Sequence, residues 1–277
     1  MLYLTPFTTA YFLVLAFILG AVFASFLGCM GWRMSNGESV LHGRSHCDSC
    51  GHILTGRDLI PIFSYLARGG KCAYCKAPIP KSSLIGEILL ATLFVLATLR
   101  WDITPKLVLM LSFICILYLL SLVDIYIQEI PDSCHVIAIG IRLVYYFIFE
   151  GFQLDSFLYL VASGFSVALP LLVLTLIMEK IMQREAMGGG DIKLIFVTGL
   201  YLGWESNLLM ILVACIVGIV VGLVQGQSMT VTEASEESEE SEEVAGNYFP
   251  FGPAIAIATV FCLFFGNGIV SWYLSLF

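Results

Sequence analysis

Long apolar runs separated by short polar segments dominate the chain. Most of these runs approach or exceed the roughly 20 residues that a helix needs to cross the hydrocarbon core of a membrane. The pattern therefore predicts an all-α, polytopic membrane protein with about eight transmembrane helices. The run at 189–204 is short and flanked by glycine, which also suits a re-entrant segment. The eight runs cover residues 7–28, 83–99, 103–123, 133–150, 157–179, 189–204, 206–226 and 251–275.

The distribution of Lys and Arg predicts how the helices are oriented. The first run lacks a basic segment before it and is long for a signal peptide, so we expect a retained anchor. The 29–82 segment holds seven of the 13 basic residues, and 180–193 holds three more. Basic loops stay in the cytoplasm, so these two segments and the 124–132 loop should face inward, with the N-terminus outside. Eight spans would leave the C-terminus outside, whereas a re-entrant 189–204 would reverse that.

Composition excludes an ordinary soluble enzyme. Only 12% of the residues are charged, against about 25% in soluble domains. The net charge of −8 depends on seven glutamates within 233–243, and without them the balance is 13 − 14 = −1. Nothing in it indicates a nucleic-acid partner. The acidic segment 227–247 is expected to be a disordered linker, or else a patch that attracts a basic substrate.

Three parts follow from these shifts in composition: a first transmembrane helix at 1–28, a small polar domain at 29–82 and a membrane domain at 83–277. The polar domain contains two CxxC pairs with 21 residues between them, close to the spacing of a four-cysteine zinc site. Four sulfur ligands leave no open coordination position, which predicts a structural zinc ion. Redox dithiols are disfavoured in a reducing cytoplasm, and His46 and His52 are expected to be surface residues. The predicted ligands are Cys47, Cys50, Cys72 and Cys75.

Two aspartates at the edges of apolar runs are the candidate catalytic residues. Asp124 ends one run and Asp191 opens another, and acids in such places are functional candidates by default. The predicted topology puts both at the cytoplasmic rim. Two neighbouring carboxylates share one proton, which is the arrangement of an aspartic protease. The residues alone favour equally a pair of helix-capping aspartates.

Three glycines, Gly188, Gly189 and Gly190, precede Asp191. Without side chains they allow close approach of a substrate strand and a positive φ. They also suit irregular backbone where a helix enters the membrane.

Several ordered motifs resemble the type IV prepilin peptidase family, over nearly the whole chain. In chain order they are Ser25-Phe26-Leu27-Gly28 to Arg33, His46-Cys47-Asp48-Ser49-Cys50-Gly51-His52, Asp58-Leu59-Ile60-Pro61 with Ser64, Gly70-Lys71-Cys72-Ala73-Tyr74-Cys75, Glu87, Asp124 through Ile130-Pro131-Asp132, Gly188-Gly189-Gly190-Asp191-Ile192-Lys193, and Pro250-Phe251-Gly252-Pro253.

The resemblance implies an aspartic endopeptidase with Asp124 and Asp191 as its catalytic pair. It would cut a short basic leader, after glycine, from prepilin or pseudopilin substrates at the cytoplasmic face of a bacterial inner membrane. The resemblance also implies N-methylation of the new N-terminal residue, usually phenylalanine, from S-adenosylmethionine, an activity associated with the 29–82 domain. No methyltransferase fingerprint of the Rossmann type is visible.

Other charged residues have two interpretations each. Asp132, after Pro131, either caps the following helix, which we favour, or holds the active-site loop or water. Glu87 either pairs with Arg142 inside the bundle or serves the methylation site. Lys193 either biases an aspartate toward ionisation or extends to the lipid headgroups.

Other classes of protein remain as alternatives. A non-enzymatic zinc-ribbon scaffold of a pilus or secretion assembly would tolerate loss of either aspartate. A proton-coupled transporter would show inverted repeats, which the sequence lacks. A presenilin-type protease would lack the two CxxC pairs.

Overall fold

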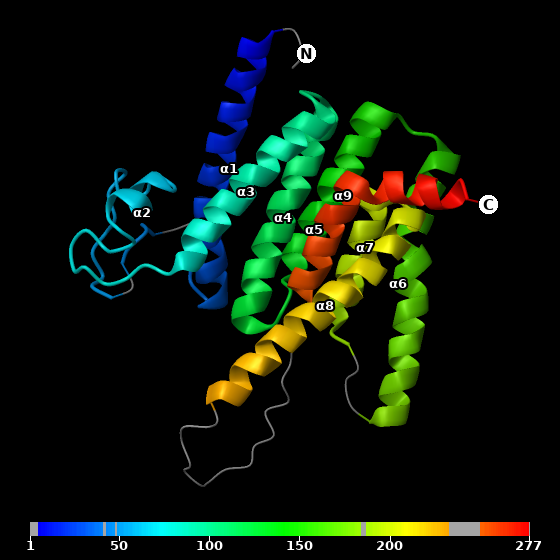
Figure 1. Ribbon diagram of the computed structural model, residues 1–277. Helices are drawn as coiled ribbons and strands as arrows, with labels where there is room; N and C mark the ends of the chain where they lie inside the picture. Colours follow the sequence, from blue (N-terminus) through cyan, green and yellow to red (C-terminus); the bar gives the residue numbers. More distant parts are fainter. Residues whose placement is uncertain (1–4, 41–42, 48, 184–186, 233–249, 277) are drawn as a thin grey trace. The chain divides into compact units, whose positions relative to one another are not determined.

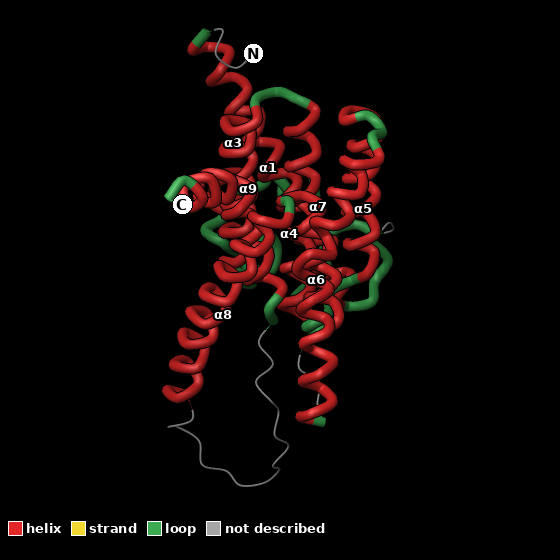
Figure 2. The backbone as a smooth tube through the Cα atoms, turned by 90° about the vertical axis from the view of Figure 1, so that its right-hand side faces the viewer, coloured by secondary structure: helices red, strands yellow, loops and turns green. Residues whose placement is uncertain are grey.

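The computed structural model describes residues 5–40, 43–47, 49–183, 187–232 and 250–276 (Figure 1). Helices dominate these residues, and no strand occurs among them apart from isolated bridges, as the tube in Figure 2 shows. The predicted all-α fold is confirmed. The elements are α1 (Pro6–Ser35), α2 (Phe63–Ala67), α3 (Lys81–Trp101), α4 (Pro105–Ile127), α5 (Asp132–Tyr145), the π-helix η1 (Tyr146–Glu150), α6 (Leu154–Met182), α7 (Gly189–Leu202), α8 (Trp204–Thr232) and α9 (Gly252–Leu274).

Seven helical stretches among the described residues are long and apolar enough to cross a membrane. They are α1, α3, α4, α5 together with η1, α6, α8 and α9. Helix α7 has 14 residues, about 21 Å at 1.5 Å per residue, which is short of the roughly 30 Å hydrocarbon core. The run at 189–204 is thus helical as predicted, but the predicted count of about eight full-length spans falls to seven.

Two helices run farther than the apolar pattern indicated. Helix α1 starts at a capping box between Thr5 and Thr8 and continues to Ser35, so residues 29–35 belong to the first helix. Helix α8 continues to Thr232, so the start of the acidic segment is helical. No proline interrupts either extension, and polar residues can continue a helix once it leaves the apolar region. The rest of that segment, 233–247, lies outside the described residues.

By packing, the chain divides into two compact units, Met1–Tyr126 and Ile127–Phe277. The three-part division by composition stays a prediction. In the first unit α1 lies along α3 (Figure 1). A Cβ atom at Gly20 would lie 2.7 Å from the Cα of Ala91. The absent side chain therefore lets the two backbones approach, as small residues do between membrane helices.

In the second unit the short helix α7 packs against α5, α6, α8 and α9. Its residues Leu194, Ile195 and Val197 are buried. The buried Thr198 hydroxyl lies 2.9 Å from the Asn207 Oδ1, and the Asn207 amide donates to the Ile195 carbonyl at 3.3 Å. A helix surrounded by neighbours is apolar on all sides, and the few polar groups it buries are hydrogen-bonded inside the unit.

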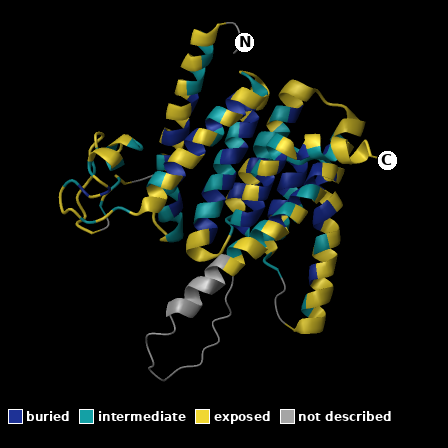
Figure 3. Cartoon of the chain, viewed as in Figure 1, coloured by how far each residue is buried: buried dark blue, intermediate teal, exposed yellow. Residues whose placement is uncertain are grey.

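Apolar side chains also cover the outside of the helices. Phe7, Val108, Phe147 and Leu212 are all more than half exposed, and Figure 3 shows exposed residues along helices of both units. A water-soluble protein rarely exposes so much contiguous apolar surface. Together with the seven long helices, this surface identifies a multi-pass membrane protein.

The close contact at Gly20 generates a prediction about stability. Gly20→Ala should destabilise the protein by about 1–3 kcal/mol, the usual cost of overpacking, because the new methyl group meets the backbone of α3. The midpoint of thermal unfolding in detergent measures this. Gly28→Ala, in the same helix with open space around its Cβ position, is the matched control, and equal midpoints for the two variants would contradict the prediction.

Candidate functional site

The four paired cysteines converge in the cysteine segment, residues 36–80 between α1 and α3. Their sulfur atoms all lie within 4.8 Å of one another, and one pair is 3.8 Å apart. Tetrahedral coordination with Zn–S bonds of about 2.3 Å puts ligand sulfurs about 3.8 Å apart. The donor set and its geometry therefore fit a metal ion. The four cysteines that could hold it are Cys47, Cys50, Cys72 and Cys75.

The first CxxC pair occupies a tight backbone turn. The Cys47 N–H donates to the His52 carbonyl at 3.0 Å, and the Gly51 N–H donates to the Cys47 carbonyl at 2.8 Å. Gly51 has φ +68°, a conformation that glycine adopts without strain. His46 and His52 are exposed and lie outside the cysteine cluster, as predicted.

The second CxxC pair repeats this turn. The Cys72 N–H donates to the Ala77 carbonyl at 2.9 Å, and the Lys76 N–H donates to the Cys72 carbonyl at 3.2 Å. Lys76 has φ +63° where the first turn has glycine. The backbone N–H groups of Cys75 and Tyr74 lower the pKa of the Cys72 thiol to about 6. A thiol that ionises near neutral pH is a ready metal ligand.

Asp58 holds together the part of the cysteine segment between the two CxxC pairs. Its carboxylate accepts from the Thr55 N–H at 2.7 Å and from the Thr55 hydroxyl at 2.6 Å, and it forms an ion pair with Arg68. The side chain is only 3% exposed. The hydrogen bonds from Thr55 and then the Arg68 guanidinium lower the pKa of this carboxyl to about 2. Asp58 entered the sequence analysis only as part of a motif.

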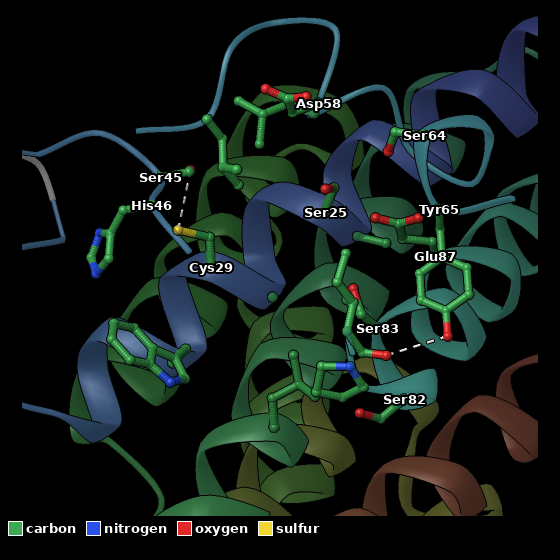
Figure 4. A pocket seen from close by; sticks show the side chains of 18 of the residues that line it. Ser25, Cys29, Ser45, His46, Asp58, Ser64, Tyr65, Ser82, Ser83 and Glu87 are labelled. Carbon is green, nitrogen blue, oxygen red and sulfur yellow. Dashed lines mark hydrogen bonds between the residues drawn. The ribbon is translucent and has the colours of Figure 1, made fainter. Parts of the chain in front are cut away.

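A cavity of about 340 Å³ lies between the cysteine segment and helices α1, α3 and α4 (Figure 4). Glu87 of α3 lines it and is 7% exposed. The Glu87 Oε2 accepts a hydrogen bond from the Ile62 N–H at 2.6 Å. Trp32, Tyr65 and Tyr118 add aromatic surface to its wall.

Of the two interpretations of Glu87, the pairing with Arg142 is wrong. The Arg142 guanidinium pairs with Glu150 at 3.1 Å, and its Nε donates to the Leu200 carbonyl at 3.0 Å. Leu200 lies in the last turn of α7, where carbonyls lack partners within the helix. Arg142 thus caps the short helix. Its positive charge is paired with Glu150, and a carbonyl at the helix end receives a hydrogen bond.

Asp124 lies near the C-terminal end of α4, which continues to Ile127, four residues beyond the predicted run 103–123. It is 4% exposed, and the neighbouring Val123 is fully buried. A buried acid in an otherwise apolar helix is costly and marks a functional candidate.

Asp191 is half-buried in the first turn of α7, where the positive end of the helix dipole favours an anion. The helix begins regularly at Gly189, and none of the three glycines has a positive φ. That part of the prediction is wrong, because Gly188 caps the helix in an ordinary extended conformation. A Cβ atom at Gly190 would meet the Ile130 side chain at 3.1 Å, whereas Gly189 has open space.

An ion pair joins the start of α5 to α7. The Lys193 Nζ lies 2.6 Å from the Asp132 Oδ1. Asp132 is itself the first residue of α5, and Pro131 holds the cap position without a side-chain hydrogen bond. The predicted cap is therefore wrong, because the carboxylate bonds Lys193 instead. Lys193 does neutralise an aspartate, but that aspartate is Asp132.

Sequence reasoning missed His135, one turn along α5 from Asp132. It is 5% exposed, and neither ring nitrogen has a hydrogen-bond partner among the described residues. A lone histidine in an apolar run gives no signal of burial until the neighbouring helices are known. Asp124 belongs to the first unit and Asp191 to the second, so their pairing stays a prediction.

Comparison with known proteins agrees with these features. The model of the "Bacterial Peptidase A24 N-terminal domain" matches residues 18–101, and that of the "Type IV leader peptidase family" matches 111–223. Proteins named prepilin leader peptidase/N-methyltransferase are similar to the chain. One from Bacillus subtilis is 29% identical over 95% of this chain and 98% of its own length. One from Pseudomonas aeruginosa is 30% identical over 83% of this chain and 74% of its own length. No solved structure matches the chain significantly.

The sulfur cluster predicts bound metal. Purified protein should contain about one zinc ion per chain, measured by elemental mass spectrometry, and Cys72→Ser should lose most of it because a buried ligand of the set is gone. Cys215→Ser, which changes an exposed cysteine outside the cluster, is the control and should retain the metal. Full zinc content in Cys72→Ser would refute the site.

The low pKa of Asp58 predicts how stability depends on pH. Its pKa is about 2 in the fold against 3.8 in the unfolded chain, so its contribution is complete above about pH 5 and is lost as pH falls toward 2. Asp58→Asn should therefore lower the thermal midpoint by a constant amount between pH 7 and 5. The difference from wild type should narrow between pH 4 and 2. Glu38→Gln, an exposed acid in the same unit, should show no such difference, and a constant gap down to pH 2 would contradict the assignment.

Proposed function

Because the chain belongs to the type IV leader peptidase family, we propose that it is a membrane aspartic endopeptidase of the bacterial inner membrane. It removes the basic leader of prepilin or pseudopilin substrates at the cytoplasmic face. One observation carries this proposal: Asp124 and Asp191 are acids near the ends of largely apolar helices, and each lies within the segment that matches the family.

The chain's topology supports a common location for the two aspartates. Two stretches of membrane-spanning length, Asp132–Glu150 and Leu154–Met182, separate them. If each stretch crosses the membrane once, the chain returns to the side from which it started, which supports our proposal that both aspartates act at one face. The basic cysteine segment precedes this region by one pair of spans, α3 and α4, which supports the cytoplasmic side.

The chemistry follows from two carboxyl groups that share one proton. The ionised carboxylate takes a proton from water, and the water oxygen attacks the carbonyl carbon of the scissile peptide bond. The protonated carboxyl donates its proton to the carbonyl oxygen. When the C–N bond breaks, the leaving nitrogen receives a proton and becomes the new N-terminus. The substrate must be unwound at this bond, because an intact helix hides its carbonyls.

Neighbouring residues support access to Asp191. Gly189 has open space at its Cβ position, which leaves room for an extended substrate strand. The ion pair between Lys193 and Asp132 ties the start of α5 to α7 and so fixes the helix that carries Asp191. We assign these residues positioning roles.

We also propose that this chain has the second activity in the relatives' name, N-methyltransferase activity. The new N-terminal amine would be methylated from S-adenosylmethionine. The cavity of about 340 Å³ is within the size range of small-molecule sites, and its mixture of aromatic and polar walls fits such a charged nucleoside. Four cysteines would hold a zinc ion whose role is structural, since no coordination position is left open.

Substitution of the aspartates tests the peptidase. Asp124→Asn and Asp191→Asn should each slow leader removal at least about 100-fold, because each removes an acid–base group. Co-expression with a prepilin, followed by mass spectrometry of the product, measures this. Asp155→Asn, an exposed acid in the first turn of α6, should process normally. Normal processing by both catalytic-site variants would favour the non-enzymatic scaffold instead.

A further inference from the structure

Glu87 is a buried carboxylate whose hydrogen-bonding capacity is mostly unused. Among the described residues its side chain makes one hydrogen bond, from the Ile62 N–H, and no ion pair. A carboxylate can accept about four hydrogen bonds, and a buried charge is costly unless it is paired. Glu87 lines the cavity and is 93% buried, since its exposed fraction is 7%. The cavity therefore presents a negative group that suits a cationic ligand.

The backbone over Glu87 is held in a strained turn. Ile62 has φ +61° and ψ −54°, and the Phe63 N–H donates to the Pro61 carbonyl at 2.5 Å. This is a γ-turn of the rare, strained kind, and a β-branched residue is especially disfavoured there. Such strain persists only where the surroundings enforce it, and it concentrates at ligand sites. The hydrogen bond from Ile62 to Glu87 is the contact that ties this turn to α3.

The rest of the cavity wall combines hydroxyl groups, apolar surface and two arginines, Arg33 and Arg68, of which Arg68 is paired with Asp58. Figure 4 shows Ser25, Ser64, Ser83 and Tyr65 around Glu87. Leu59 and Leu122 contribute apolar wall. The Tyr118 hydroxyl occupies the space where a side chain at position 86 would lie, next to Glu87 in the chain. A ligand with a positively charged group on an apolar residue would pair its charge with Glu87 and pack its apolar part against the leucines.

The geometry points to this cavity as the site of N-methylation, with the Glu87 carboxylate binding the N-terminal ammonium of the cleaved substrate. The inference rests on the proposed methyltransferase activity and adds the acceptor site to it. The ligand class is a peptide with a free N-terminal amine and an apolar first residue. Glu87 would be a catalytic residue in the sense that it touches the reacting nitrogen.

The reaction requires the substrate nitrogen to lose a proton before its lone pair can react. The Glu87 carboxylate orients the ammonium while water takes that proton. When bound, S-adenosylmethionine supplies a methyl group on a positively charged sulfur. The N–C bond forms as the S–C bond breaks, the sulfur becomes neutral and the nitrogen becomes a methylammonium. The product remains a cation beside Glu87, so a single charge serves both substrate and product.

The cavity and the peptidase aspartate use different faces of α4. Tyr118, Leu122 and Tyr126 line the cavity at intervals of four residues, which places them on one face. Asp124 is two residues from Leu122, about 200° around a helix of 3.6 residues per turn. The two reactions would therefore occur at the same end of α4 but on separate faces, and substitutions should separate them.

Glu87→Gln tests the inference directly, because the amide oxygen can still accept from Ile62 while the charge is gone. With a co-expressed prepilin, leader removal should stay within about 2-fold of wild type, while methylation, read as the added mass of one methyl group, should fall at least about 100-fold. Glu87→Asp keeps the charge and should retain part of the methylation. Glu38→Gln removes an exposed charge from the same unit and should leave both activities unchanged.

Binding provides a readout that is independent of turnover. A fluorescent peptide with N-terminal phenylalanine should bind the wild-type protein more tightly than its N-acetylated form does. Glu87→Gln should abolish that difference. Retained preference for the free amine, or equal loss of methylation in Glu87→Asp and Glu87→Gln, would overturn the role of Glu87. Absence of methylation in the wild type would instead refute the proposed methyltransferase function, and this inference with it.

Discussion

The cost of placing a polar group among apolar helices governs where the polar residues of this protein are found. The hydrocarbon core of a membrane contains no water, so a polar group there must form its hydrogen bonds with other groups of the protein. Arg142 shows the rule fully satisfied, with Glu150 and the Leu200 carbonyl as its partners. Thr198 and Asn207 show it on a smaller scale. Against this background Glu87, with one hydrogen bond among the described residues, and His135, with none, stand out as sites that a ligand or water would complete.

Helix α7 shows how the same constraint positions chemistry. A helix of 14 residues leaves carbonyls without partners at its C-terminal end, and Arg142 supplies one of the missing donors. Its N-terminal end is fixed by the ion pair of Lys193 with Asp132. Both ends are thus held by side chains of α5. The first turn between these anchors carries Asp191, so the candidate catalytic acid lies on an element whose position is set from both sides.

The cysteine segment has a different source of order. It is too small to bury a core, and its one short helix, α2, has no buried residue. Small domains of this kind depend on a metal or another covalent constraint. Here four sulfurs and the hydrogen bonds of Asp58 close the segment. This rigidity has a use outside the segment, because it holds the strained turn at Ile62 against Glu87.

The sequence by itself determined the helical class, because apolar runs of membrane length admit few other structures. It also determined the four sulfur ligands, because CxxC spacing is local and each turn is closed by bonds within seven residues. The apolar pattern did not predict that α1 ends at Ser35 and α8 at Thr232, because apolar residues mark the part of a helix within the lipid and not the ends of the helix.

Partners distant in the chain required the tertiary structure. Arg142 and Glu87 both carry charge in apolar segments, and from the sequence their pairing was one of two interpretations of Glu87. In the structure Arg142 pairs with Glu150, and Glu87 accepts from a backbone N–H 25 residues away. The same holds for Asp132, which pairs with Lys193 rather than capping its own helix. A local sequence pattern determines a helix because the helix is stabilised by interactions between residues close in the chain. A buried charge, in contrast, pairs with whichever group the packing of the helices places next to it.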